Sequence, residues 1–200
     1  MSKFLAAILA LFMLASVGCA SNSPAYPGTQ SYPPVAPPYP GVQSGAAPPV
    51  ASTVVTVDAL FRRAEEAYQA GDIDQTIANY TQAIELSPKF LEAYYNRAIA
   101  YEDKGSFDQA LADYDYVIAL DPQYTRAYYN RGILNYNRGN LDQAIADDST
   151  AIELTPAMSR AYNNRGIVYD DQGKLDQAIA DFSKAVEIDS GFADACPRLR

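Results

Sequence analysis

The chain of 200 residues contains no histidine and has only two cysteines, Cys19 and Cys196. Histidine is the commonest general base and the commonest transition-metal ligand, so its absence removes much of catalytic chemistry. Two cysteines without histidine do not complete an ordinary tetrahedral zinc site. We therefore expect no enzymatic activity and no bound metal or other cofactor.

Charged residues are almost missing from the N-terminal part of the chain. Lys3 is the one charged residue before Asp58, and the formal net charge of the whole chain is −9. An acidic domain repels phosphate backbones and gains nothing at an anionic membrane surface. Nucleic acid is therefore not an expected partner.

The first 18 residues have the composition of an export signal. Lys3 is followed by twelve almost entirely apolar residues, Phe4 to Ala15. A positive start followed by a short apolar run is typical of such signals. The run is short for a membrane-spanning helix, which needs about 20 apolar residues.

The signal ends in Ser16-Val17-Gly18-Cys19, which resembles the bacterial lipobox, although Ser16 stands where leucine is usual. The resemblance implies removal of residues 1–18 and lipidation of Cys19, palmitate included. Two alternatives are cleavage after Ala20 by ordinary signal peptidase and an uncleaved anchor. By resemblance to lipoprotein sorting, Ala20 after the cysteine implies the outer membrane, facing the periplasm. Without the lipid the protein would be soluble and periplasmic.

Residues 19–56 form a proline-rich linker. The stretch from Ser21 to Thr53 holds nine of the 13 prolines and no charge. Such a segment does not bury enough apolar surface to offset its ordering entropy, so we expect a disordered spacer. The recurrence of Tyr-Pro at residues 26–27, 32–33 and 39–40 leaves open a docking site for an aromatic-lined groove.

A period of 34 residues governs residues 57–192. One glycine, one aspartate and one proline recur in register, although Ser190 replaces the fourth proline. These residues are Gly71, Gly105, Gly139 and Gly173; Asp74, Asp108, Asp142 and Asp176; and Pro88, Pro122 and Pro156. Self-similarity at a fixed period of this length indicates a solenoid of stacked units.

Each unit is predicted to contain two helices, A and B. Helix A, about 58–70 in the first unit, ends at glycine, which tolerates the left-handed conformation that closes a helix. The recurrent aspartate opens helix B, where it is expected to cap free N–H groups and complement the dipole. Proline ends the unit because the residue before it avoids helix.

The residues at these positions resemble the tetratricopeptide signature: Tyr94, Ala98, Tyr101, Ala110, Tyr114, Val117 and Pro122 in the second unit. Local departures are Ala67, Thr76, Asn135 and Asp148. The resemblance implies an all-α, right-handed solenoid of four helix-turn-helix repeats, 57–90, 91–124, 125–158 and 159–192, with a short tail at 193–200. It also implies a non-catalytic scaffold or adaptor of the cell envelope that binds protein segments. The alternative is a structural protein that self-associates without a peptide ligand.

The family resemblance further implies that A-helix residues line a concave groove for extended peptides. Here those positions hold Tyr95, Asn96, Ile99, Arg126, Tyr129, Asn130, Ile133, Arg160, Asn164 and Ile167. The asparagines recur once per unit and resemble the asparagine ladder of the O-linked N-acetylglucosamine transferase superhelix. An asparagine side chain both donates and accepts, so it suits a peptide backbone. The alternative is that these asparagines merely cap or solvate helix A.

A second periodic set pairs an arginine with an aspartate sixteen residues later. The pairs are Arg97–Asp113, Arg131–Asp147 and Arg165–Asp181. Sixteen residues lead from helix A across the turn into helix B, where the charges can meet as a bidentate pair. Because each arginine has its own aspartate, we favour interhelical salt bridges over an anion-binding site.

The last repeat is expected to leave an apolar flank open. Only residues 193–200 follow it, so Ile179, Phe182 and Val186 are predicted to remain partly exposed. Such a surface suits a second copy of the chain, and Cys196 lies close by in sequence. A homodimer through the C-terminal repeat is therefore a possible assembly.

Overall fold

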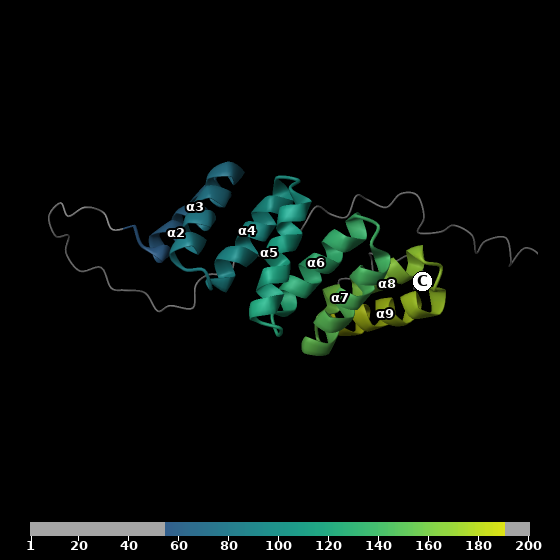
Figure 1. Cartoon of the computed structure of the whole chain (residues 1–200). Coiled ribbons are helices and arrows are strands. Elements are labelled where there is room, and N and C mark those ends of the chain that lie inside the picture. Colours follow the sequence, from purple (N-terminus) through teal and green to yellow (C-terminus); the bar gives the residue numbers. More distant parts are fainter. Residues whose placement is uncertain (1–54, 191–200) are drawn as a thin grey trace, which may run out of the picture. The chain divides into compact units, whose positions relative to one another are not determined.

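The computed structural model describes residues 55–190, which contain eight α-helices and no strand (Figure 1). The helices are α2 (Val57–Gln69), α3 (Ile73–Leu86), α4 (Leu91–Asp103), α5 (Phe107–Leu120), α6 (Thr125–Asn137), α7 (Leu141–Leu154), α8 (Ser159–Asp171) and α9 (Leu175–Ile188). The all-α fold of consecutive helix-turn-helix repeats is confirmed. The signal, nearly all of the linker and the tail lie outside the described residues.

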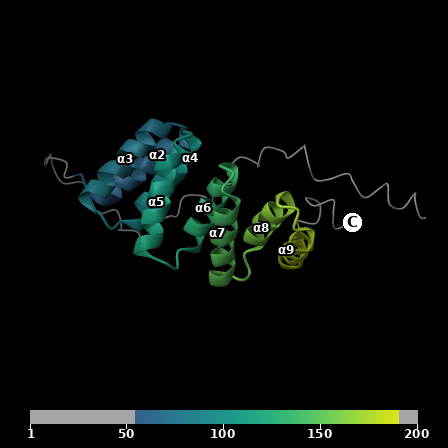
Figure 2. The same ribbon diagram turned by 45° about the vertical axis from the view of Figure 1, so that its right-hand side comes forward.

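The described residues fall into two compact units, one containing α2 to α7 and the other containing α8 and α9. In the first unit the helices pack as the pairs α2/α3, α4/α5 and α6/α7, and α3/α4 and α5/α6 pack between pairs (Figures 1 and 2). In the second unit α8 packs against α9. Each A helix therefore packs against the B helix that follows it.

The recurrent glycines end the A helices as predicted. Gly71, Gly105, Gly139 and Gly173 have φ between 72° and 80°. At Gly105 its N–H donates to the Glu102 carbonyl at 2.8 Å, and the Ser106 N–H donates to the Tyr101 carbonyl at 2.7 Å. This pair of bonds satisfies two end carbonyls of α4 and turns the chain into α5.

The recurrent aspartates do not cap the B helices, so that part of the prediction is wrong. Asp74, Asp108, Asp142 and Asp176 are each the second residue of their helix. The residue before the helix is the cap, and among the four B helices only Asp72 makes a side-chain cap, accepting from the Gln75 N–H at 3.0 Å. The recurrent aspartates still lie in the first turn, where they complement the helix dipole.

Polar contacts link neighbouring repeats within the first unit. Lys104 Nζ lies 2.6 Å from Asp74 Oδ1, and Arg138 pairs in the same way with Asp108; each pair spans 30 residues. Contacts of a second kind span 16 residues: Arg97 Nη1 donates to Thr81 Oγ1 at 3.0 Å, and Arg131 Nη1 donates to Asp115 Oδ1 at 2.6 Å. Each repeat is therefore joined to the one before it by the same two kinds of bond.

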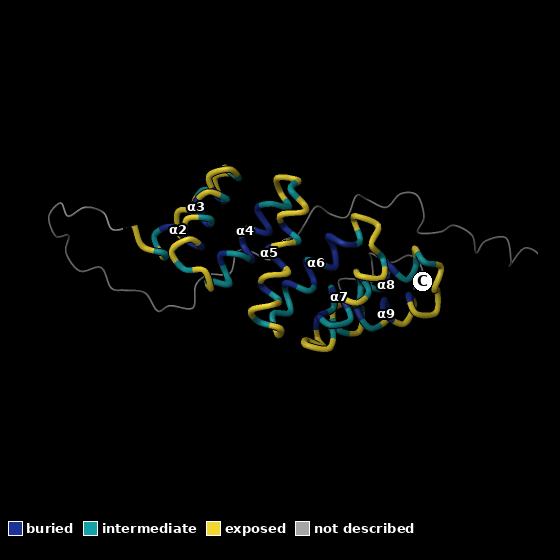
Figure 3. The backbone as a smooth tube through the Cα atoms, in the orientation of Figure 1, coloured by how far each residue is buried: buried dark blue, intermediate teal, exposed yellow. Residues whose placement is uncertain are grey.

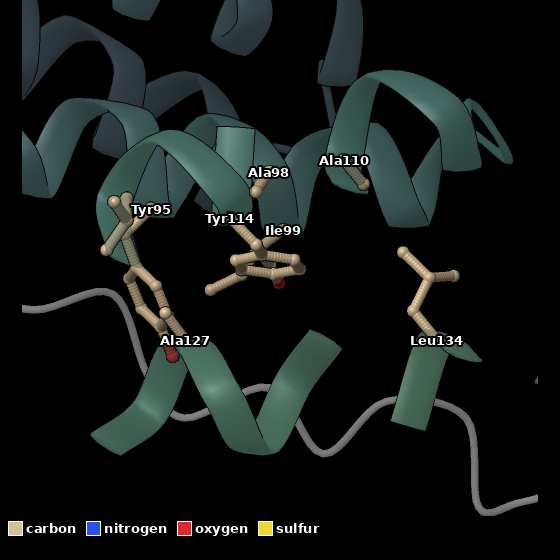
Figure 4. Packing of buried hydrophobic residues seen from close by; sticks show 8 residues of the cluster. Tyr95, Ala98, Ile99, Ala110, Tyr114, Ala127 and Leu134 are labelled. Atoms are coloured by element: carbon tan, nitrogen blue, oxygen red, sulfur yellow. The ribbon is translucent and has the colours of Figure 1, made fainter. Parts of the chain in front are cut away.

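Buried side chains of α4, α5 and α6 form one continuous apolar cluster. It contains Tyr95, Ala98, Ile99, Ala110, Tyr114, Val117, Ala127 and Leu134. Figure 4 shows Tyr95 reaching from α4 toward Ala127 of α6, with the ring of Tyr114 beside Ile99. Figure 3 shows the buried positions along the helices, with exposed residues concentrated at their ends and turns. The alanines let the helix backbones approach closely enough for the tyrosine rings to fill the space between them.

In the second unit Phe182 is buried, 5% exposed, and lies against Gly166 of α8. The prediction of an open flank is therefore wrong for Phe182, because the missing side chain of glycine leaves room for its ring. Ile179, at 45% exposed, fits the prediction, and Val186 is half-buried. Leu175, one turn before Ile179, is also exposed.

Candidate functional site

Most of the residues predicted to line a groove are buried in the structure. On α4 these are Tyr95, Asn96 and Ile99, and on α6 they are Tyr129, Asn130 and Ile133. Arg126, also on α6, is half-buried. Tyr95 is 0% exposed, so it belongs to the core and presents no surface to a ligand in this conformation.

The three predicted residues of α8 belong to the separate second unit. Asn164 is buried, whereas Arg160 and Ile167 are half-buried. The amide nitrogen of Asn164 has no hydrogen-bond partner.

Asn130 is held in place by two tyrosine hydroxyls. Its Nδ2 donates to Tyr95 Oη at 3.1 Å and to Tyr114 Oη at 3.2 Å. These three residues come from α6, α4 and α5, so one amide ties three helices together. Because a buried polar group that loses its partner is costly, Asn130 has a structural role within the core.

Asn96 occupies the equivalent position one repeat earlier but has no such partners. It is 3% exposed, and neither its Nδ2 nor its Oδ1 makes a hydrogen bond. Thirty-four residues before Tyr95 stands Phe61, which has no hydroxyl to accept from the amide. Tyr80, the equivalent of Tyr114, lies close enough for Asn96 to lower the pKa of its hydroxyl slightly, although burial dominates and raises that pKa. Asn96 therefore keeps a buried amide whose hydrogen-bonding capacity is unused.

A carboxylate lies at the end of the Asn130 hydrogen-bond chain. The hydroxyl of Tyr114 accepts from Asn130 and donates to Glu102 Oε1. Burial raises the pKa of Glu102 to about 7; the bond from Tyr114 opposes this rise, and the neighbouring charge of Asp103 adds to it. Near neutral pH Glu102 therefore exchanges between its neutral and its charged form.

The arginine and aspartate pairs are confirmed as interhelical salt bridges. Arg97 donates to both oxygens of Asp113 at 2.8 Å, and Arg165 does the same with Asp181. In the third pair Arg131 donates at 3.1 and 2.6 Å to Asp147, which is 2% exposed. Because each arginine donates to both carboxylate oxygens of its aspartate, these arginines join helix A to helix B and have a structural role.

Aromatic rings flank the same arginines. Arg97 lies between Tyr94 and Tyr101, with 5.4 and 5.7 Å from its guanidinium carbon to the ring centres. Asn135 occupies the position equivalent to Tyr101 one repeat later, and its Nδ2 donates to Asp147 Oδ2 at 3.1 Å. The departure of Asn135 from the family pattern therefore replaces a stacked ring with a hydrogen bond to the salt bridge.

Tyr114 was predicted from the sequence as part of the family signature, but the B-helix tyrosines were not related to the A-helix asparagines. Tyr80 of α3 and Tyr114 of α5 occupy the signature aromatic position of helix B, which predicts core packing alone. Their spacing of 16 residues before Asn96 and Asn130 is the one signal that relates them to the asparagines. Glu65, in register with Ile99, was also missed, and burial raises the pKa of its carboxyl.

Within residues 55–190 no group of three or more cysteine, aspartate or glutamate side chains is arranged to hold a metal ion. In the same part of the chain, every helix is too short or too polar to cross a membrane.

Models of the tetratricopeptide repeat match residues 61–125, 95–159 and 159–192, which together span more than half of the sequence. The chain belongs to the tetratricopeptide repeat family. Arrays of such repeats are modules for interaction with other proteins, and their stacked helices form extended binding surfaces.

Solved structures with similar folds include several members of this family. The crystal structure of MamA is 28% identical, with a TM-score of 0.65 over 69% of this chain and 81% of MamA. The first repeat domain of Spaghetti (RPAP3), bound to the HSP90 peptide SRMEEVD, is 26% identical, with a TM-score of 0.57 over 59% and 94%. The Arabidopsis OM64 domain, 24% identical with a TM-score of 0.56 over 58% and 96%, shares the fold. No curated protein sequence matches the chain.

Proposed function

We propose that this chain is a non-catalytic scaffold that binds an extended segment of a partner protein along helices α4 and α6. The observation that carries this proposal is the amide of Asn96, whose donor and acceptor are both unused. A peptide backbone offers the matching acceptor and donor. Asn96 is 3% exposed, so binding requires the side chains that cover it to move aside.

The RPAP3 domain supports the proposal because it has a similar fold and is bound to a peptide. That peptide, SRMEEVD, contains three acidic residues. The present chain has the carboxylate of Glu102 on α4, and its net charge is −9. The ligand of this chain is therefore expected to differ in charge from that peptide.

Site-specific photo-crosslinking in cells tests this function. A photoreactive residue replaces Arg126 on α6, which is half-buried, and in a matched control it replaces Glu85, which is exposed on α3. We expect one partner protein to be captured from position 126 and not from position 85. A synthetic peptide from the captured segment should then bind the wild-type protein more tightly than the Asn96→Ala variant. Equal capture from both positions would contradict the proposal.

The envelope location is part of the proposal and rests on the lipobox-like residues that end in Cys19. Lipidation there would place the repeats at the surface of the outer membrane, facing the periplasm, with residues 19–56 as the spacer. Mass spectrometry of the mature N-terminus tests it. We expect a chain that begins at Cys19 and carries acyl groups, and a chain that begins at Ser21 without acyl mass would contradict it.

Self-association through α9 is the second candidate function. Leu175 and Ile179, one turn apart on α9, are 48% and 45% exposed, so they form a small apolar surface. If this surface joins two copies, Ile179→Lys should convert a dimer into a monomer in sedimentation experiments at high concentration. A wild-type protein that sediments as a monomer would exclude this assembly.

A further inference from the structure

The carboxylate of Glu102 is held in a fixed orientation by residues from three helices. Tyr114 of α5 donates to its Oε1, and Asn130 of α6 donates to Tyr114 at 3.2 Å and to Tyr95 of α4 at 3.1 Å. Tyr95 and Tyr114 are 0% exposed, and Asn130 is 5% exposed. A carboxylate fixed in this way loses little conformational entropy when it binds a ligand, which is the condition for an efficient binding group.

Glu102 differs from the carboxylates of Asp113 and Asp147 in having no cationic partner. Asp113 and Asp147 each accept two bonds from an arginine. Among residues 55–190 no ion pair involves Glu102, and Tyr114 is its one side-chain hydrogen-bond donor. A desolvated carboxylate without a counter-charge is unfavourable, so the folded chain retains here a cost that a bound cation would remove.

The surroundings of Glu102 also favour a positive ligand. On α4 the next residue, Asp103, adds negative charge and accepts from the Tyr68 hydroxyl at 2.7 Å. From α5 the Tyr114 hydroxyl bonds to Glu102, and the Asn130 amide of α6 donates to that hydroxyl; both groups are uncharged near neutral pH. Arg97 of α4 is occupied by Asp113, so it does not neutralise this region.

We propose that Glu102 is the binding group for a basic side chain, lysine or arginine, of the extended partner segment. The inference rests on the proposed function and assigns the chemistry of one ligand position. Its Oε1 remains bonded to Tyr114, and its Oε2 takes the ammonium or guanidinium group of the ligand. The same arrangement rejects an acidic side chain at this position.

The titration of Glu102 supplies a signature that a purely structural residue lacks. With a pKa of about 7, about half of the Glu102 side chains are protonated at pH 7. A bound cation favours the charged form, so binding at pH 7 releases about half a proton for each ligand. A peptide that binds this chain through its backbone alone, with no cation at Glu102, releases no proton at this site.

A panel of capped nonapeptides tests the proposal. The central residue is arginine, lysine, citrulline or glutamate, and the flanking positions are mixtures of glycine, alanine, serine and valine. Citrulline is the uncharged isostere of arginine, so this pair isolates the charge. We expect the arginine and lysine peptides to bind the wild-type protein about tenfold more tightly than the citrulline peptides, as for a charge-assisted hydrogen bond. Calorimetry in buffers of different ionisation enthalpy should show the proton release.

Two variants separate the role of Glu102 from a general effect of charge. Glu102→Gln keeps the shape of the neutral acid, so it should fold, lose the preference for arginine over citrulline and release no proton. Glu85→Gln on the exposed side of α3 makes the same change in net charge and should retain both properties. Equal binding of arginine and citrulline peptides by the wild-type protein would overturn the cation site and leave the scaffold function standing. Binding of none of the peptides would overturn both.

Discussion

At the scale of single residues, Phe61 removes one of the two hydroxyls that the equivalent amide uses one repeat later. The ring of Phe61 lies 5.4 Å from that of Tyr80 and 5.1 Å from that of Phe90. One repeat later the equivalent rings of Tyr95, Tyr114 and Tyr124 lie 5.9 and 5.1 Å apart. The rings are arranged similarly at the two sites, but Phe61 lacks the hydroxyl that Tyr95 offers to Asn130, and the hydroxyl of Tyr80 does not accept from Asn96 either.

Phe61→Tyr should therefore stabilise the protein. The new hydroxyl would accept from Asn96 as Tyr95 accepts from Asn130, and one buried hydrogen bond contributes about 1 kcal/mol. Chemical denaturation measures the change. The matched control is the same substitution in an Asn96→Ala background, where the gain should vanish. A Phe61→Tyr variant that is equally destabilised in both backgrounds would show that the hydroxyl does not reach the amide.

Glu102 makes the stability of the fold depend on pH. Its carboxyl has an ordinary pKa of 4.5 and a pKa of about 7 in the folded chain. Between these values the folded state holds a proton that the unfolded state has lost. The contribution of Glu102 to the free energy of unfolding therefore falls as the pH rises from 4.5 to 7 and stays low above it.

Glu102→Gln should remove this part of the pH dependence. Because the full shift corresponds to about 3 kcal/mol and the side chain keeps some contact with solvent, we expect the variant to gain about 1–2 kcal/mol over the wild type between pH 4.5 and 8. Denaturation curves at several pH values measure this difference. Parallel stability profiles for the two proteins would mean that Glu102 titrates as an exposed carboxylate.

At the scale of helix pairs, Asp147, the partner of Arg131, is the most deeply buried of the three salt-bridged aspartates. Asp147 also accepts from Asn135 at 3.1 Å and from Gln143 at 3.2 Å. Arg131→Ala would leave this carboxylate buried without its counter-charge, with a loss of up to about 3–5 kcal/mol. The double change with Asp147→Ala should cost less than the sum of the single changes, with a coupling above about 1 kcal/mol. Additive losses would show that the two residues act independently.

The packing of α8 against α9 requires Gly166, which stands where α4 has Ala98. A Cβ at Gly166 would lie 2.8 Å from Phe182 Cε1, whereas a Cβ at Gly132 of α6 would lie 3.3 Å from its nearest atoms, in Asp147 and Asp148. Alanine favours a helix over glycine by about 1 kcal/mol. At position 132 the gain in helix propensity should exceed the cost of a small shift of Asp147 and Asp148. At position 166 the clash of the new Cβ with the ring of Phe182 should cost more than that gain.

Gly166→Ala is therefore expected to destabilise the protein by about 1–2 kcal/mol, and Gly132→Ala to change its stability little. Thermal unfolding of both variants checks this. Shortening the ring side chain in the double variant Gly166→Ala, Phe182→Leu should recover part of the loss. A stabilised Gly166→Ala variant would show that Phe182 moves aside freely.

At the scale of the whole molecule, the features predicted from the sequence are those that depend on neighbouring residues. Gly105 ends α4 because of its own backbone conformation. Pro122 follows the last residue of α5, Leu120, by two positions and prevents the helix from continuing. The pair Arg97–Asp113 needs only one tight turn between two antiparallel helices. Local rules that repeat every 34 residues therefore predicted the helices, the turns and the salt bridges.

The chain from Glu102 through Tyr114 to Asn130 was not predictable in the same way. Its members come from three helices, and the bonds depend on how deeply the rings of neighbouring repeats interpenetrate. The repeat pattern places Tyr95 on the inner side of α4, but it does not show that the ring is completely enclosed. The depth of each position is set by packing between repeats, which a one-dimensional pattern does not contain.

The bonds between repeats have a consequence for how genes of this kind change in length. Lys104 contacts a residue 30 positions earlier and Arg97 one 16 positions earlier, and Arg138 and Arg131 do the same one repeat later. A recombination event that duplicates or removes a 34-codon cassette joins donors and acceptors of matching kind, so the new junction is bonded at once. Inserting a single codon inside a helix shifts every later side chain of that helix by about 100° around its axis and breaks the junction. Viable length variants within the repeats should therefore differ by whole cassettes.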